Sequence, residues 1–339
     1  MFNQININMK IMTKFKFWML AILIVPFLVV SCDTEEDPPE INEAEVLIEY
    51  MENPGSPAAN YGNSGLAIKS AEATHAGIVA GTVLAIDIRS ATDFTDLGHI
   101  PEAINMPAAD VRAYIDGNDL SAYTEIHIVC YSGQTASWLT SLLQLAGYKN
   151  VYSMKFGMSA WHQDFDVWSS KTNNEKATLF VATSTDKGPE GDLPILTTGY
   201  ETGADIFEAR FAAVLAEGFG PAAVTNAEVY GDLAGYYIIN YWPELEYVDP
   251  GHIDGAVQYT PNESLSLDTF LETLPTNKPI AVYCYTGQNS ARIAAYLRVM
   301  GYNAKSVKFG CNAMIYDEMT KGTWSEAAIM GYAHTGMTK

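Results

Sequence analysis

One pattern of residues occurs twice in this chain, and this internal repeat limits the possible folds more than any other feature. The segments CYSGQTAS (130–137) and CYTGQNSA (284–291) each follow an apolar run and precede a helical pattern. In each copy the cysteine lies 17 residues before a glycine. In each copy a polar residue also lies 11 residues before the glycine of a Gly-His-Ile motif. These matched spacings, in a chain of 339 residues, predict a duplicated domain.

Each copy alternates strand-like and helix-like segments. The runs TVLAIDI (82–88), IHIVCY (126–131) and PIAVYCY (279–285) are short, apolar and rich in β-branched residues, which is typical of buried parallel strands. After each cysteine loop, apolar residues recur at helical spacing until Gly147 or Gly301, where a glycine can end a helix. We therefore predict an α/β fold of two domains, each a parallel sheet with helices on both faces. Ligands of such folds bind beyond the carboxyl ends of the strands, where both cysteine loops fall.

The N-terminal residues are typical of an export signal. Three lysines precede an apolar stretch from Phe17 to Val30, whose 14 residues are fewer than the about 20 that span a bilayer. The stretch ends in Val-Val-Ser-Cys (29–32), which resembles the lipobox of bacterial lipoproteins and predicts lipidation of Cys32. An ordinary signal peptide or an anchor helix is the alternative. The lipid would hold the protein in the cell envelope, at the outer membrane or cell surface of a Gram-negative bacterium, with no other membrane contact.

Composition and the repeat divide the chain into five segments. We predict a lipoprotein signal peptide at 1–31, an acidic tether at 32–45, a first domain at 46–170, a linker at 171–200 and a second domain at 201–335.

Charge and cysteine content narrow the class of partner. The formal net charge is −21, whereas nucleic acid binding calls for basic patches, so we expect no nucleic acid partner. Apart from Cys32 the chain has three cysteines, an odd number that leaves at least one thiol unpaired. The sequence has no CxxC spacing and no cysteine–histidine cluster, and its six histidines are scattered. We therefore predict no metal site.

A loop between a strand and a helix N-terminus favours an anion, because backbone N–H groups and the helix dipole point at it. A cysteine at the first position of the loop can supply that anion as a thiolate. We expect the pKa of Cys130 and Cys284 to fall from about 8.5 into roughly the 3.5–7.5 range. Gly133 and Gly287 would let the backbone curl around the sulfur. The alternative is that both cysteines are buried apolar residues at the ends of strands.

Together, these motifs resemble the rhodanese domain. In the first copy they are Asp87-Ile88-Arg89, then Gly98-His99-Ile100-Pro101, and finally the loop that begins at Cys130. The resemblance covers about residues 75–170 and, more loosely, 225–330. It implies a sulfurtransferase whose cysteine accepts a sulfane sulfur from a small donor, holds it as a persulfide and passes it to a thiol or cyanide. It implies no cofactor.

The resemblance also implies roles for individual residues. Cys130 and Cys284 would be catalytic, the other loop residues would bind substrate, and residues of the remaining motifs would support the structure. The loop residues are Tyr131, Ser132, Gly133, Gln134, Thr135, Tyr285, Thr286, Gly287, Gln288 and Asn289, and the supporting residues are Asp87, Arg89, His99 and His252. In this fold Cys311 would border the second loop, where it would form a disulfide with Cys284 or receive its sulfur. The alternative is that it is a small buried residue.

Both loops depart from the family pattern. Neither contains the arginine or lysine that attracts thiosulfate in many members, so an anionic donor would need cations from Lys155, Arg292, Arg298 or Lys308. The Cys130 loop is closer to the branch that uses 3-mercaptopyruvate. Neither loop ends in the arginine of the phosphatase branch, which excludes that activity. Two functions are left: an exported sulfurtransferase, which we favour because both copies contain the cysteine, and a non-catalytic rhodanese-like binding or scaffold lipoprotein.

Overall fold

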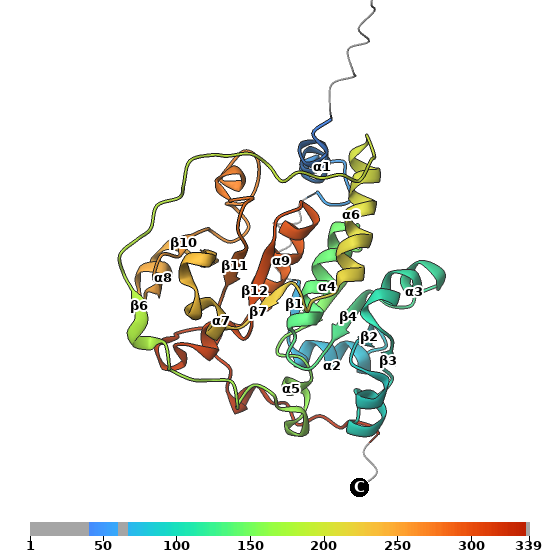
Figure 1. Cartoon of the computed structure of the whole chain (residues 1–339). Coiled ribbons are helices and arrows are strands. Elements are labelled where there is room, and N and C mark those ends of the chain that lie inside the picture. Colours follow the sequence, from blue (N-terminus) through green and yellow to red (C-terminus); the bar gives the residue numbers. More distant parts are fainter. Residues whose placement is uncertain (1–40, 60–66, 337–339) are drawn as a thin grey trace, which may run out of the picture. The chain divides into compact units, whose positions relative to one another are not determined.

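The computed structural model describes residues 41–59 and 67–336 (Figure 1). The predicted signal peptide, Cys32 and most of the predicted tether lie outside the described residues. Among the residues that are described, no helix combines the length and the apolar character needed to cross a membrane. The described residues all belong to one compact unit.

The first repeat forms a five-stranded parallel sheet. Its strands are β1 (Ile68–Lys69), β2 (Val83–Asp87), β3 (Ile104–Asn105), β4 (Glu125–Val129) and β5 (Val151–Met154), arranged in the order β1-β5-β4-β2-β3. All neighbouring strands are parallel. Every residue of β2 is buried, as a strand covered on both faces requires.

The second repeat has the same topology. Its strands are β7 (Ala223–Val224), β8 (Tyr237–Asn240), β10 (Val257–Gln258), β11 (Ile280–Tyr283) and β12 (Ala304–Val307), arranged in the order β10-β8-β11-β12-β7. All neighbouring strands are again parallel. Read from its other end, this order is β7-β12-β11-β8-β10, which matches the order of the first sheet strand by strand. The predicted fold of two parallel-sheet α/β domains is therefore confirmed.

Helices connect the strands and cover the sheets (Figure 1). The α-helices are α1 (Glu43–Glu52), α2 (Ala71–Val79), α3 (Val111–Gly117), α4 (Gln134–Leu145), α5 (Met158–Trp161), α6 (Gly203–Glu217), α7 (Asn226–Gly231), α8 (Glu244–Val248) and α9 (Gln288–Val299). Single 3₁₀ turns span Ala108–Asp110, Gln163–Phe165, Ala177–Leu179, Leu233–Gly235, Leu271–Thr273, Gly310–Ala313, Tyr316–Glu318 and Glu326–Ala328, and a π-helical turn spans Asp93–Leu97.

The helices that follow the cysteine loops end at the predicted glycines. Gly147 and Gly301 have φ values of +100° and +103°, in the left-handed region that favours glycine. After α4, the N–H of Tyr148 donates to the carbonyl of Leu143 at 3.0 Å, and the N–H of Gly147 donates to that of Gln144 at 3.1 Å. These two bonds form a Schellman motif, which satisfies carbonyls that a helix end leaves open.

α4 and α9 pack against each other and join the two repeats (Figure 1). Side chains of both helices belong to one hydrophobic core, including Leu139 and Leu142 from α4 and Leu297 from α9. The Ser141 hydroxyl of α4 also donates to the carbonyl of Arg292 in α9 at 2.8 Å. The interface between the repeats is therefore built from the same helices that begin at the cysteine loops.

After the first repeat, the chain crosses onto the second. This crossing uses the first part of the predicted linker, residues 171–200. The N–H of Lys176 donates to the carbonyl of Met314 at 3.0 Å. A short strand, β6 (Phe180–Val181), then pairs antiparallel with β9 (His252–Ile253), which contains the histidine of the second Gly-His-Ile motif.

After the second repeat, the chain crosses back in the equivalent way. The N–H of Tyr332 donates to the carbonyl of Trp161 at 3.1 Å, and Thr335 forms an antiparallel bridge with His99. Trp161 occupies in the first repeat the place of Met314 in the second. Each repeat is thus completed by the segment that follows the other, an arrangement that ties the two domains together through their backbones. We call residues 324–336 the C-terminal segment.

Candidate active site

Both cysteines lie at the carboxyl end of a central strand, as the sequence predicted. Cys130 directly follows β4, and Cys284 directly follows β11. The loops then turn into α4 and α9 through Gly133 and Gly287, which have φ values of +82° and +76°. A Cβ atom at Gly133 would lie 2.8 Å from the carbonyl oxygen of Met154, so the loop requires glycine for space as well as for conformation.

Each sulfur accepts a hydrogen bond from a backbone N–H group at the start of the helix that follows its loop. The N–H of Ala136 donates to Cys130 Sγ at 3.4 Å, and the N–H of Ser290 donates to Cys284 Sγ at 3.3 Å. The N–H groups of Ser132 and Gly133 also hydrogen-bond to Cys130. The two thiols are 6 % and 1 % exposed, respectively, so both cradles are covered in this conformation.

The predicted lowering of the pKa at Cys130 is wrong. Burial raises the pKa of the Cys130 thiol above its ordinary value, because the thiolate would lose its hydration. The N–H groups of Ala136, Gly133 and Ser132 lower the pKa, but by less, and the carboxylate of Asp87 raises it further. The loop does supply the expected hydrogen bonds. The cost of burying the thiolate charge, which the loop sequence does not reveal, is larger than the stabilisation from these hydrogen bonds.

We therefore expect alkylation of Cys130 by iodoacetamide to have a pH midpoint above that of an ordinary thiol, because the thiolate is the reactive form. The folded pKa exceeds the unfolded one, so this group stabilises the fold below about pH 8.5, and the contribution is lost as the pH rises through the folded pKa. The measurement is the alkylation rate of the Cys130 peptide by mass spectrometry between about pH 6 and pH 10. The urea-unfolded chain is the control. A folded midpoint at or below the unfolded one would contradict the expectation.

The two loop glutamines bridge the repeats. Gln134 Oε1 accepts the N–H of Phe309 at 2.8 Å, and Gln288 Oε1 accepts the N–H of Phe156 at 3.0 Å. Gln288 Nε2 also donates to the carbonyl of Gly133 in the first loop at 3.3 Å. Sequence reasoning assigned both side chains to substrate binding. The structure places them in the buried interface, where each loop is held by the opposite repeat.

The other residues of the first loop contact its immediate surroundings. The ring of Tyr131 lies under the guanidinium of Arg89, whose carbon is 5.1 Å from the ring centroid. Burial, and then a hydrogen bond to Asp93, raise the pKa of Tyr131 to about 12. Ser132 Oγ accepts a hydrogen bond from Gln134 Nε2 at 3.0 Å, and Thr135 is half-buried.

A cavity of about 270 Å³ borders the second loop. Two of the four cations that the sequence left unplaced line it: Lys155 from the first repeat and Arg292 from α9. A third, Arg298, forms an ion pair with Glu217. The remaining lining residues are Ala67, Ile68, Tyr285, Thr286, Gln288, Asn289 and Gly322. The positive charge that the second loop itself lacks is therefore supplied by Lys155 and Arg292, which lie outside the loop in the sequence.

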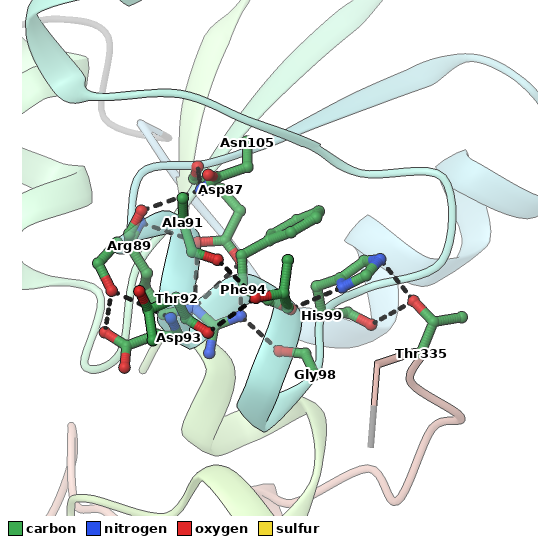
Figure 2. Close-up of polar contacts among 12 residues, drawn as sticks. Asp87, Arg89, Ala91, Thr92, Asp93, Phe94, Gly98, His99, Asn105 and Thr335 are labelled. Carbon is green, nitrogen blue, oxygen red and sulfur yellow. Dashed lines mark hydrogen bonds and ion pairs between the residues drawn. The ribbon is translucent and has the colours of Figure 1, made fainter. Parts of the chain in front are cut away.

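Asp87 and Arg89 form a buried ion pair beside the first loop (Figure 2). Arg89 Nη2 donates to Asp87 Oδ2 at 2.7 Å and to the carbonyl of Gly98 at 2.7 Å. Arg89 Nε donates to both carboxylate oxygens at 3.0 Å. Asn105 Nδ2 bonds the carbonyls of Asp87 and Arg89 at 2.8 and 2.9 Å. The pair therefore fixes the end of β2 to the turn that contains the Gly-His-Ile motif.

The second repeat replaces this ion pair with neutral groups. Asn240 and Trp242 occupy the places of Asp87 and Arg89. Asn240 Nδ2 donates to the hydroxyl of Tyr283 at 2.8 Å, and Trp242 stacks on Tyr285 with ring centroids 4.7 Å apart. The ring of Tyr285 in the second loop therefore packs against the aromatic ring of Trp242, whereas the ring of Tyr131 in the first loop packs against the guanidinium of Arg89.

The motif histidines are held at both ring nitrogens. His99 Nδ1 lies 2.8 Å from the carbonyl of Phe94, and its Nε2 lies 2.6 Å from Thr335 Oγ1 (Figure 2). His252 Nδ1 lies 2.7 Å from the carbonyl of Tyr247, and its Nε2 lies 3.0 Å from that of Thr183. Both rings are thereby fixed in their turns and tied to the crossing segments.

Cys311 lies next to Cys284 in the core. Its N–H donates to the carbonyl of Cys284 at 3.0 Å, and its side chain is fully buried. Burial and the neighbouring Cys284 raise the pKa of the Cys311 thiol well above its ordinary value. Cys130, Cys284 and Cys311 are free thiols in this structure.

Comparison with known proteins identifies the family. A sequence model of the rhodanese-like domain matches residues 70–164 and 227–315, more than half of the chain. The protein belongs to the rhodanese-like domain family. The two matches coincide with the two repeats, so the family assignment covers both cysteine loops.

Three solved structures are also similar to the chain. A thiosulfate sulfurtransferase from Pseudomonas aeruginosa is 16 % identical, with 84 % of this chain and 49 % of that one covered and a TM-score of 0.30. A 3-mercaptopyruvate sulfotransferase from Escherichia coli is 17 % identical, with 71 % and 97 % covered and a TM-score of 0.27. A rhodanese-like domain protein from Staphylococcus aureus is 19 % identical, with 28 % and 89 % covered and a TM-score of 0.24.

Proposed function

We propose that this protein is an exported sulfurtransferase that carries a sulfane sulfur as a persulfide on Cys130 and Cys284. The observation that carries the proposal is the hydrogen bonding of backbone N–H groups to each sulfur, from Ser132, Gly133 and Ala136 at Cys130 and from Ser290 at Cys284. A persulfide ends in an outer sulfur anion, and hydrogen-bond donors fixed in place stabilise such a charge without reorganising. Export and lipid anchoring through Cys32 belong to the same proposal, supported by the sequence of residues 1–32.

The proposed reaction has two steps. After the thiol of Cys130 or Cys284 loses its proton to water, the thiolate attacks the outer sulfur of the donor. A new sulfur–sulfur bond forms on the cysteine, and the donor's bond to that sulfur breaks, so that sulfite leaves with the electron pair when thiosulfate is the donor. A thiol or cyanide then attacks the outer sulfur and releases the cysteine thiolate. Dividing the transfer in this way replaces one difficult step with two easier ones.

The cavity beside the second loop favours an anionic donor for Cys284. Lys155 and Arg292 line it, and their charges would offset the strongly negative protein around them. Cys284 itself does not line the cavity and is 1 % exposed. Loading of Cys284 therefore requires the second loop to open toward the cavity.

A second candidate function is a rhodanese-like binding or scaffold lipoprotein without turnover. The burial of both thiols favours it, as does the position of Gln134 and Gln288 in the interface between the repeats. A loop held in this way presents a fixed surface to a partner. The raised pKa of the Cys130 thiol also favours this function, because it reduces the thiolate fraction at neutral pH.

The test is to load the purified full-length chain with sulfur under reducing, anaerobic conditions. Thiosulfate, 3-mercaptopyruvate and a polysulfide are offered in turn, and peptide mass spectrometry measures the gain of one sulfur at each cysteine. Cys130→Ala and Cys284→Ala assign the signal. We expect sulfur on the unmutated cysteine in each variant, and its loss on addition of cyanide or a thiol.

Lys155→Met tests the role of the cavity. We expect it to slow the loading of Cys284 from thiosulfate severalfold and to leave the loading of Cys130 unchanged. No sulfur on either cysteine from any donor would reject the enzyme in favour of the binding module.

A further inference from the structure

Two histidines and an aspartate that are far apart in the sequence meet on the first repeat. His162 and Asp164 follow α5, and His334 belongs to the C-terminal segment. Asp164 Oδ2 lies 3.4 Å from His162 Nδ1 and 3.3 Å from His334 Nε2. One possible ligand atom from each residue lies within 4.8 Å of the other two. The sequence alone predicts no metal site here, because His334 lies far from His162 and Asp164 along the chain.

We propose that His162, Asp164 and His334 bind a divalent transition-metal ion of the zinc class. Imidazole nitrogens and a carboxylate oxygen are ordinary zinc ligands, with bonds of about 2.0–2.2 Å. Two ligands at that distance in a tetrahedron lie about 3.4 Å apart. The two separations to Asp164 Oδ2 match this value, and the two histidine nitrogens lie within 4.8 Å of each other, so binding an ion would draw the histidine rings closer together.

His334 differs from the histidines that have structural roles. Both ring nitrogens of His99 have short contacts to fixed oxygens. His334 faces Asp164 through Nε2, and its Nδ1 is buried with no hydrogen-bond partner among the described residues. In His162, Nδ1 accepts the N–H of Asp164 at 3.2 Å, a bond that the metal would replace. The exposed carboxylate of Asp164 gives the ion access to water, which would occupy the fourth position.

The proposed site would fasten the C-terminal segment to the first repeat. His334 is next to Thr335, which bridges to His99, and two residues from Tyr332, which bonds to Trp161. In the second repeat, Ile315 occupies the place of His162, so the same ligand set does not recur there. The site uses none of the cysteines, and the inference therefore stands or falls independently of the proposed sulfur transfer.

The test uses the full-length chain without a histidine tag, freed of metal by a chelator. Zn²⁺ is titrated by calorimetry, and Co²⁺ is added to read the coordination geometry from its visible absorption. We expect one Zn²⁺ per chain, a tetrahedral Co²⁺ spectrum and a rise in Tm of several degrees on adding metal. His162→Gln, Asp164→Asn and His334→Gln should each weaken Zn²⁺ binding by at least about tenfold.

His75→Gln is the matched control. His75 stacks on Tyr332 of the same C-terminal segment, with ring centroids 3.9 Å apart, but lies outside the cluster. It should bind Zn²⁺ as tightly as the unmutated chain. Measuring the Tm of each variant without metal separates loss of a ligand from loss of the fold. The proposal is overturned if no saturable Zn²⁺ site is found, or if binding survives all three substitutions and is lost in Cys130→Ala or Cys284→Ala.

Discussion

Gly157→Ala is expected to slow sulfur loading at Cys130 by about 100-fold, because this glycine packs directly against the backbone of the first cysteine loop. Gly157 has φ +61° and ψ −151°, a backbone region that is essentially restricted to glycine. A Cβ atom there would lie 2.3 Å from the carbonyl oxygen of Cys130 and 2.6 Å from the nitrogen of Gly133. Both are backbone atoms, so the loop itself must move. A displacement of about 1 Å at a reacting centre costs about 100-fold in rate.

The same substitution should lower the free energy of unfolding by about 2–6 kcal/mol, the sum of backbone strain and overpacking. Gly310→Ala is the matched variant in the second repeat, where the added Cβ would lie 2.2 Å from the carbonyl oxygen of Cys284. We expect each variant to affect chiefly its own cysteine. Gly188→Ala, which adds a methyl group to open space, should affect neither. Equal loading of both cysteines in Gly157→Ala would contradict this role of the glycine.

The sequence predicted the parts of the fold that local pattern determines. The strands before Cys130 and Cys284 were recognised because a buried parallel strand needs a continuous apolar run. The helix ends at Gly147 and Gly301 were recognised because a left-handed residue there favours glycine. The repeat itself then made the second sheet a copy of the first.

Contacts between distant segments could not be predicted in this way. Gln134 and Gln288 are polar residues in a cysteine loop, and nothing local distinguishes a substrate contact from a bond to the opposite repeat. The burial of Cys130 likewise comes from the packing of the folded chain and not from the residues of its loop, so the predicted direction of its pKa shift is wrong. Lys155 reaches the second loop, and His334 reaches the first repeat, only because the domains pack together and the chain ends cross between them.

Asp87→Ala is expected to lower the free energy of unfolding by about 3–5 kcal/mol, because it leaves the guanidinium of Arg89 buried without its countercharge. Both side chains of the pair are 1 % exposed, so the pair is shielded from bulk water. Asn240→Ala is the matched control at the equivalent position of the second repeat. It removes one neutral hydrogen bond to the hydroxyl of Tyr283, which costs about 1 kcal/mol. Urea unfolding curves of the two variants measure the difference.

The double variant Asp87→Ala/Arg89→Met separates the value of the pair from the cost of breaking it. Removing both charges takes away the attraction and the desolvation penalty together, and such replacements are often neutral or stabilising. We expect the double variant to be more stable than Asp87→Ala alone, while still losing the bond from Arg89 to the carbonyl of Gly98. The second repeat, with Asn240 and Trp242 at these positions, folds the same strand end without charges. A double variant as unstable as the single one would mean that Arg89 holds the turn mainly through Gly98 and not through Asp87.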